Sequence, residues 1–168
     1  MARKELLISP DLYDLDRPIA GLDVIRLHNR QRYEMEQLTA IVYENADEKT
    51  CVGYKDMTEN EFWVRGHIPG MPILPGVVIC EAAAQLASYF CGKCQMMEGQ
   101  MMGFAGLEDV KFRGIVRPGD RLVIQAKLLK LRKFLITAQF MAIVGENIVS
   151  EGILKGFPMS DELLKNEE

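Results

Sequence analysis

The stretch that most constrains the fold is residues 76–91, GVVICEAAAQLASYFC. It contains no proline and no interior glycine, and its alanines favour an α-helix. Apolar side chains cover nearly the whole circumference of that helix, and a helix that is apolar on all sides is buried in a folded protein. The rest of the chain must therefore supply a shell around it.

Strand-like segments can supply this shell. Residues 38–46 and 50–57 are rich in β-branched and aromatic residues, and the polar link 47–49 joins them as a hairpin. Four further strand-like runs follow the helix, with turns at Pro118-Gly119 and Gly145-Glu146, at about 104–113, 120–132, 134–144 and 147–157. The pattern predicts an α+β fold in which a curved antiparallel sheet, ending in a four-strand meander, wraps around one long helix.

Length and composition predict a single domain of ordinary globular type. We expect an irregular arm with a short helical piece over 1–30, the domain over 31–160 and a polar tail over 161–168. There is no apolar run of the roughly 20 residues that cross a membrane, and no signal-peptide block, so a cytoplasmic location is expected. The net charge of −4 argues against a nucleic-acid partner, and four cysteines do not indicate a disulfide framework.

The chemistry-bearing residues gather in GHIPGMPILPGVVICEAAAQ, residues 66–85. His67 is one of two histidines, and the prolines that follow it at every third position stiffen the path to the helix because proline fixes φ. Gly76 offers an N–H at the positive end of the helix, with no side chain to block a ligand. Glu81 is a lone acid in an apolar helix, where a carboxylate must find a partner or become protonated.

A base, a carboxylic acid and an oxyanion donor suit proton abstraction next to a carbonyl, followed by loss of a leaving group. The alternatives at this point are a structural histidine and a glutamate on a wet helix face.

Two blocks of sequence resemble a known family. The segment 66–85 is similar to the signature of the FabZ-type (3R)-hydroxyacyl-acyl carrier protein dehydratases, H-F-P-x-x-P-x-x-P-G-V-x-x-x-E-x-x-A-Q. The matching residues are His67, Pro69, Pro72, Pro75, Gly76, Val77, Glu81, Ala84 and Gln85. The second block, VKFRGIVRPGDRL at 110–122, resembles the family's basic-Phe-Arg…Pro-Gly-Asp-x-Leu segment, and the resemblance runs from about residue 32 to 157.

The resemblance implies a hotdog fold and a homodimer, often assembled as a trimer of dimers, in which each site pairs the histidine of one subunit with the glutamate of the other. His67 would remove the α-proton of an acyl thioester, the partner's Glu81 would protonate the departing β-hydroxyl, and the Gly76 amide would hold the thioester carbonyl. No metal or organic cofactor is implied. The candidate substrate-binding residues are Phe62, Ile68, Pro75, Val77, Gln85 and Phe104.

The implied substrate is carried by acyl carrier protein, an acidic partner with a phosphopantetheine arm. Residues 111–133 contain eight Lys or Arg and one acid, which suits such a partner. Arg113, Arg117 and Arg121 are the candidates for contact with the carrier. The alternative is a solvated strand face.

The sequence departs from the family pattern in places that leave other readings open. Arg32-Tyr33-Glu34-Met35 stands where the family has Arg-Tyr-Pro-Phe, and Ile68 replaces a phenylalanine. Acyl chain length, the carrier form, the pathway and the assembly state therefore stay open, as do two other functions, a hotdog acyl thioesterase and a non-catalytic acyl- or carrier-binding subunit. The CxxC of Cys91 and Cys94 lacks the second ligand pair that a structural zinc needs.

Overall fold

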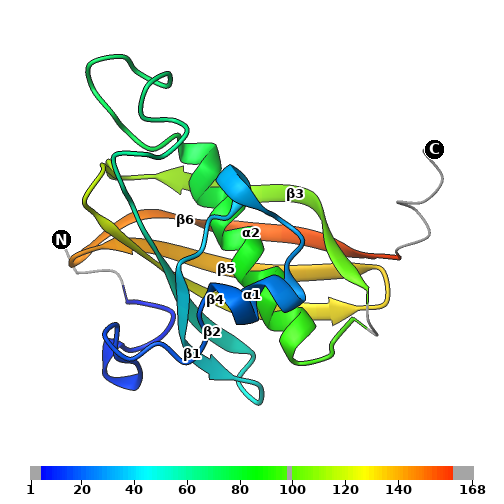
Figure 1. The fold of residues 1–168 in the computed structure, drawn as a ribbon. Helices are drawn as coiled ribbons and strands as arrows, with labels where there is room; N and C mark the ends of the chain where they lie inside the picture. The colour runs from blue at the N-terminus through cyan, green and yellow to red at the C-terminus, as the bar shows by residue number, and fades with distance from the viewer. Residues whose placement is uncertain (1–4, 98–99, 161–168) are drawn as a thin grey trace, which may run out of the picture.

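The computed structural model describes residues 5–97 and 100–160, so the tail expected at 161–168 lies outside the described residues (Figure 1). The predicted strands and long helix are confirmed, with ends that shift by a few residues. They are β1 (Ala40–Asn45), β2 (Thr50–Asp56), α2 (Gly76–Lys93), β3 (Met101–Phe112), β4 (Arg121–Arg132), β5 (Leu135–Val144) and β6 (Asn147–Met159). The arm contains a short helix, α1 (Leu22–His28), and two 3₁₀ turns, at Pro10–Leu12 and Tyr33–Met35.

The strands form one antiparallel sheet in the order β1-β2-β4-β5-β6-β3. The predicted meander is therefore correct for β4, β5 and β6 but wrong for β3. β4 already has β2 on one side and β5 on the other, so β3 crosses to the far edge and pairs with β6, where Lys111 lies opposite Glu151.

Helix α2 lies across the inner face of the sheet, as the sequence predicts (Figure 1). Twelve of its residues are buried, from Ile79 and Cys80 through Ala82 to Cys91. The close approach needs a glycine in β2, because a Cβ at Gly53 would lie 3.0 Å from Leu86 Cδ1. Each large apolar side chain buried here contributes about 1.5–3 kcal/mol to stability relative to exposure.

The first part of the arm, around residues 6–15, covers the opposite, outer face of the sheet, whereas α1 packs against α2 on the inner side. Ile8 packs with Val52, Val123 and Ile143 in a second apolar cluster. The fully buried side chain of Gln125 pairs with the Ile8 backbone as a strand would: Ile8 N–H donates to Oε1 at 3.1 Å, and Nε2 donates to Ile8 O at 2.7 Å. The arm is thus fixed to the sheet by a side chain.

The two edges of the sheet differ. The arm pairs with the outer edge of β1 through a bridge between Ala20 and Ile41. No strand among the described residues pairs with the outer edge of β3. An unpaired edge strand is a template for pairing with another chain, so β3 is the open edge of this sheet.

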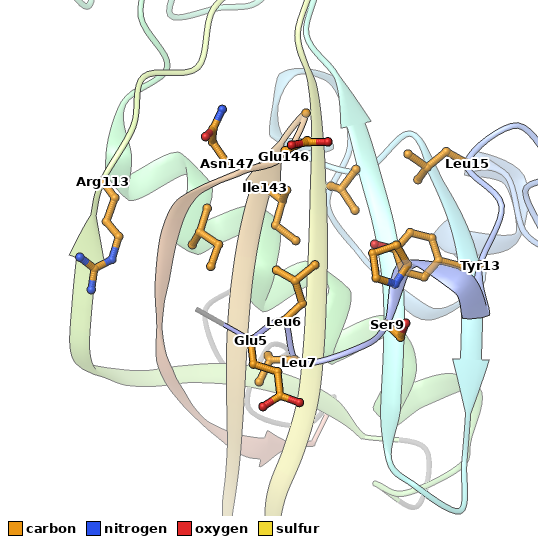
Figure 2. Close-up of a pocket in the computed structure, with 14 residues that line it drawn as sticks. Glu5, Leu6, Leu7, Ser9, Tyr13, Leu15, Arg113, Ile143, Glu146 and Asn147 are labelled. Carbon is orange, nitrogen blue, oxygen red and sulfur yellow. The ribbon is translucent and has the colours of Figure 1, made fainter. Parts of the chain in front are cut away.

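A hollow of about 1370 Å³ lies between the arm and the outer face (Figure 2). Leu6, Val123, Ile143 and Ile148 supply its apolar lining, and Arg113 lies at one side. Because its strand residues belong to the outer face, the sheet separates this hollow from α2.

We predict that Gln125→Leu destabilises the arm. The change leaves the Ile8 N–H and C=O without their partner, and each unpaired buried group costs about 1–3 kcal/mol. Urea unfolding should show the loss, whereas Gln139→Leu on the neighbouring strand should be nearly neutral. Equal stability of the two variants would contradict the pairing.

Candidate active site

His67 lies in the loop of residues 57–75, which stands away from the sheet and the helix (Figure 1). Its ring Nδ1 is 2.8 Å from the carbonyl oxygen of Ile73. A carbonyl only accepts, so Nδ1 carries a hydrogen, and in the neutral tautomer that this contact selects Nε2 is the nitrogen without one. The ring is exposed, so Nε2 is available to take a proton.

The loop is anchored although its tip projects. The side chains of Trp63 and Leu74 are buried in the core, and the Leu74 N–H donates to Val116 O at 2.9 Å. The His67 N–H donates to Trp63 O at 3.0 Å. Pro72, which lies between these anchors, and Pro75, which directly follows Leu74, restrict the path that brings the Ile73 carbonyl back to the imidazole.

Gly76 is the first residue of α2, and its N–H has no hydrogen-bond acceptor among the described residues. A helix N-terminus leaves such donors free and carries partial positive charge. A Cβ at this position would lie 2.8 Å from the ring of Phe112. The glycine therefore makes room for an aromatic neighbour.

Glu81 finds the partner that its position requires. Gln85 Nε2 donates to Glu81 Oε1 at 2.7 Å, one helical turn away. The Glu81 side chain is only partly buried, so it lies where α2 emerges from the core.

Within one chain, His67 and Glu81 have different hydrogen-bond partners. Neither makes a hydrogen bond or an ion pair with the other: the imidazole contacts Ile73 and the carboxylate contacts Gln85. The hydrogen bonds within a single chain therefore do not link the base to the acid.

The candidate substrate-binding residues divide into two groups. Phe62, Val77 and Phe104 are exposed, and Ile68 and Pro75 are half-buried, so all five can contact a ligand or a partner. Gln85 is only 2% exposed and its amide is fully hydrogen-bonded, so the structure does not support a direct contact with substrate.

Sequence reasoning did not include Phe112 among the candidate site residues. It lies against Gly76 with half its surface exposed. Its place in the second block, Val110-Lys111-Phe112-Arg113, was the available signal.

Two of the three carrier-contact candidates are engaged within the chain. Arg113 pairs with Glu151 at 2.7 Å, and Arg121 pairs with Asp56 at 2.6 Å while stacking over Tyr54. Arg117 makes no side-chain hydrogen bond or ion pair with the described residues. The basic stretch also splits between the two ends of β4, roughly 35 Å apart at about 3.3 Å per residue.

The CxxC at the end of α2 offers little reactivity. Burial raises the pKa of the Cys91 thiol to about 12, and burial also raises the pKa of Cys94. A protonated thiol is neither a nucleophile nor a metal ligand. Among the residues that the structure describes, no group of three or more His, Cys, Asp or Glu side chains could hold a metal ion. No helix in this part of the chain is long and apolar enough to span a membrane.

A curved antiparallel sheet around a central helix defines the hotdog class of folds, here with a histidine, a free helix N–H and a glutamate near the helix start. The chain belongs to the FabA-like domain family, which matches residues 29–153.

Two similar sequences are 3-hydroxyacyl-[acyl-carrier-protein] dehydratases FabZ. The one from Caldanaerobacter subterraneus is 37% identical over 121 residues, 72% of this chain and 85% of that protein. The one from Clostridioides difficile is 39% identical over 106 residues, 63% of this chain and 75% of that protein.

Solved structures confirm the fold. The dehydratase heterocomplex ApeI:P of Xenorhabdus doucetiae matches with a TM-score of 0.71 at 13% identity, over 84% of this chain and 97% of that one. An uncharacterized protein from Pyrococcus horikoshii matches with a TM-score of 0.59 at 16% identity, over 89% and 99%.

An ion pair fixes the segment that contacts Gln85. The Arg26 guanidinium donates to both carboxylate oxygens of Glu36, at 2.5 and 2.8 Å. This hydrogen bonding holds the pKa of Glu36 below its usual value. A lowered folded-state pKa adds stability that is present above the unfolded pKa and is lost as pH falls through the folded value.

We therefore predict that Glu36→Gln lowers stability modestly at pH 7. The difference from the unmodified protein should vanish as the pH falls below the lowered pKa of Glu36. Urea midpoints across this pH range provide the measurement, with Glu34→Gln, an exposed neighbour without a side-chain partner, as the control. A difference that stays constant with pH would show that the ion pair is not its cause.

Proposed function

We propose that this protein dehydrates (3R)-hydroxyacyl groups, carried on acyl carrier protein, to trans-2-enoyl groups. The observation that carries the proposal is the His67 imidazole, whose Nδ1 is held by a peptide carbonyl so that Nε2 is free to act as a base. Glu81 and the Gly76 N–H supply the acid and the oxyanion donor in the matching motif. The dehydratase names of relatives that match most of their length support the substrate class.

The reaction follows from these roles. Nε2 of His67 takes the α-proton, and negative charge develops on the thioester oxygen next to the Gly76 N–H, where the helix dipole stabilises it. The Cβ–O bond breaks as Glu81 donates a proton to the leaving hydroxyl, which departs as water. His67 ends protonated and Glu81 ionised, and proton exchange with solvent restores both.

A second copy of the chain completes each site. His67 and Glu81 share no hydrogen bond within one chain, and the open edge of β3 can pair with its own copy. Exposed apolar side chains surround this edge and the helix start, which marks an association surface; they are Val77, Phe104, Leu107 and Phe112. A trimer of such dimers and a cytoplasmic location remain predictions.

We predict that His67→Ala and Glu81→Gln each lower hydration of a crotonyl-carrier substrate by at least about a hundredfold. Co-expression of the two inactive variants should restore about a quarter of the activity, since half the dimers formed at random contain one intact site. Steady-state assays of the separate and mixed preparations measure this.

The same assay tests the alternatives. Release of free thiol without reversible hydration would indicate a thioesterase and contradict the proposal. Full activity of either single variant would do the same. Loss in the single variants without any recovery on co-expression would contradict the shared site.

The hairpin formed by β4 and β5 is a candidate docking site for acyl carrier protein because it is basic. Lys127, Lys130, Arg132 and Lys133 make no side-chain hydrogen bond or ion pair with the described residues. Register places this hairpin level with the start of β3, because Leu131 lies opposite Ile136, Ile136 opposite Gly156, and Gly156 opposite Phe104.

Antiparallel pairing of two β3 strands would set the start of one beside the end of the other. The basic hairpin of one subunit would then lie on the side of the partner's Gly76, where an acidic carrier must dock.

We predict that the double change Lys130→Glu with Arg132→Glu raises KM for the carrier-linked substrate by about tenfold at low salt, since such charges steer encounter. KM for a pantetheine-linked analogue should stay unchanged, because that substrate has no carrier surface. Arg17→Glu, an exposed charge on the arm, is the matched control. An equal effect on both substrates would contradict docking at this hairpin.

A further inference from the structure

The Gln85 side chain lies at the centre of a buried hydrogen-bond network. Nε2 donates to Glu81 Oε1 and to Met35 O, each at 2.7 Å, and Oε1 accepts the Gln37 N–H at 2.9 Å. The side chain is 2% exposed. All three contacts are short, and both amide hydrogens are used.

Backbone groups set the orientation of this amide. The Gln37 N–H can only donate and the Met35 carbonyl can only accept, so a flipped amide would face a donor with a donor and an acceptor with an acceptor. The nitrogen of Gln85 must therefore face Glu81.

The segment that supplies these backbone groups is itself fixed. Glu36, which lies between Met35 and Gln37 in sequence, forms the ion pair with Arg26. Its backbone carbonyl accepts a hydrogen bond from Lys55 Nζ at 3.2 Å. Asn29 Nδ2 donates to the backbone carbonyl of Gln85 at 2.9 Å. Hydrogen bonds thus fix both the backbone of Gln85 and the segment that its side-chain amide contacts.

The amide distinguishes the two oxygens of Glu81. An amide nitrogen donates and does not accept a proton, so Oε1 is occupied by a donor and cannot carry the acidic hydrogen toward Gln85. Because the carbonyl oxygen of a protonated carboxyl group accepts hydrogen bonds better than its hydroxyl oxygen does, this donor favours placing the hydrogen on Oε2.

We infer, on the basis of the proposed function, that Gln85 is a positioning residue which makes Glu81 Oε2 the one oxygen that exchanges a proton with the substrate. The segment of residues 35–37 acts through Gln85, and Gln85 acts through Glu81. Gln85 itself touches no substrate atom.

Two substitutions test this role in the full-length protein. Gln85→Met keeps the volume but removes the donor, so kcat for hydration of crotonyl-carrier should fall by about 10- to 100-fold, with KM little changed and the loss equal at every pH. Gln85→Glu supplies a donor only while the introduced carboxyl is protonated, so its kcat should recover as the pH is lowered.

Gln125→Leu is the matched control: it changes an equally buried glutamine with three hydrogen bonds on the outer face, and its pH profile should match that of the unmodified protein.

The outcomes separate this inference from the proposed function. Absence of hydration by the unmodified protein would overturn the proposed function. With an active unmodified protein, wild-type kcat in Gln85→Met would overturn the positioning role. A pH-independent kcat in Gln85→Glu that equals the value for Gln85→Met would also overturn it, because a loss of folded protein alone has that signature.

Discussion

The burial of α2 is the constraint on which the rest of the structure depends. A helix with apolar residues on all sides cannot face water along its length, so the sheet must curve around it. Glu81 and Gln85 interrupt the apolar surface on one side, and there the helix meets the segment of residues 33–37 instead of a strand. Glu81 therefore lies at the part of α2 that the curved sheet does not cover.

The chain itself covers both faces of the sheet but only one of its two edges. The arm occupies the outer face through Ile8 and Gln125 and protects β1 through Ala20. β3 is left with an open edge and exposed Phe104 and Phe112. Because one edge is closed by the chain itself, association through strand pairing can proceed in only one direction, which favours a closed dimer over a growing fibre.

The sequence predicts the elements well because their signals are local. The alanine-rich run defines α2, and turn residues such as Pro118-Gly119 and Gly145-Glu146 separate the strands. The partner of β3 depends instead on which strands already flank β4, a choice that no local pattern contains. The sheet contact of the arm was also missed, since one glutamine, Gln125, replaces the hydrogen bonds of a strand. For the site, motif spacing predicted His67, Gly76 and Glu81, and their catalytic roles stay predictions. The ion pairs of Arg113 and Arg121 join residues 38 and 65 positions apart, so spacing along the chain could not reveal them.

The group that orients His67 is a peptide carbonyl, that of Ile73. Many catalytic histidines are oriented by a carboxylate, which a single substitution can delete. Here every amino acid at position 73 would still present the same oxygen. A substitution at position 73 therefore does not remove the acceptor of this hydrogen bond, whereas a substitution of a side-chain partner would remove it. The residues that matter for this hydrogen bond are instead Pro72 and Pro75, because their rings restrict the direction of the Ile73 carbonyl.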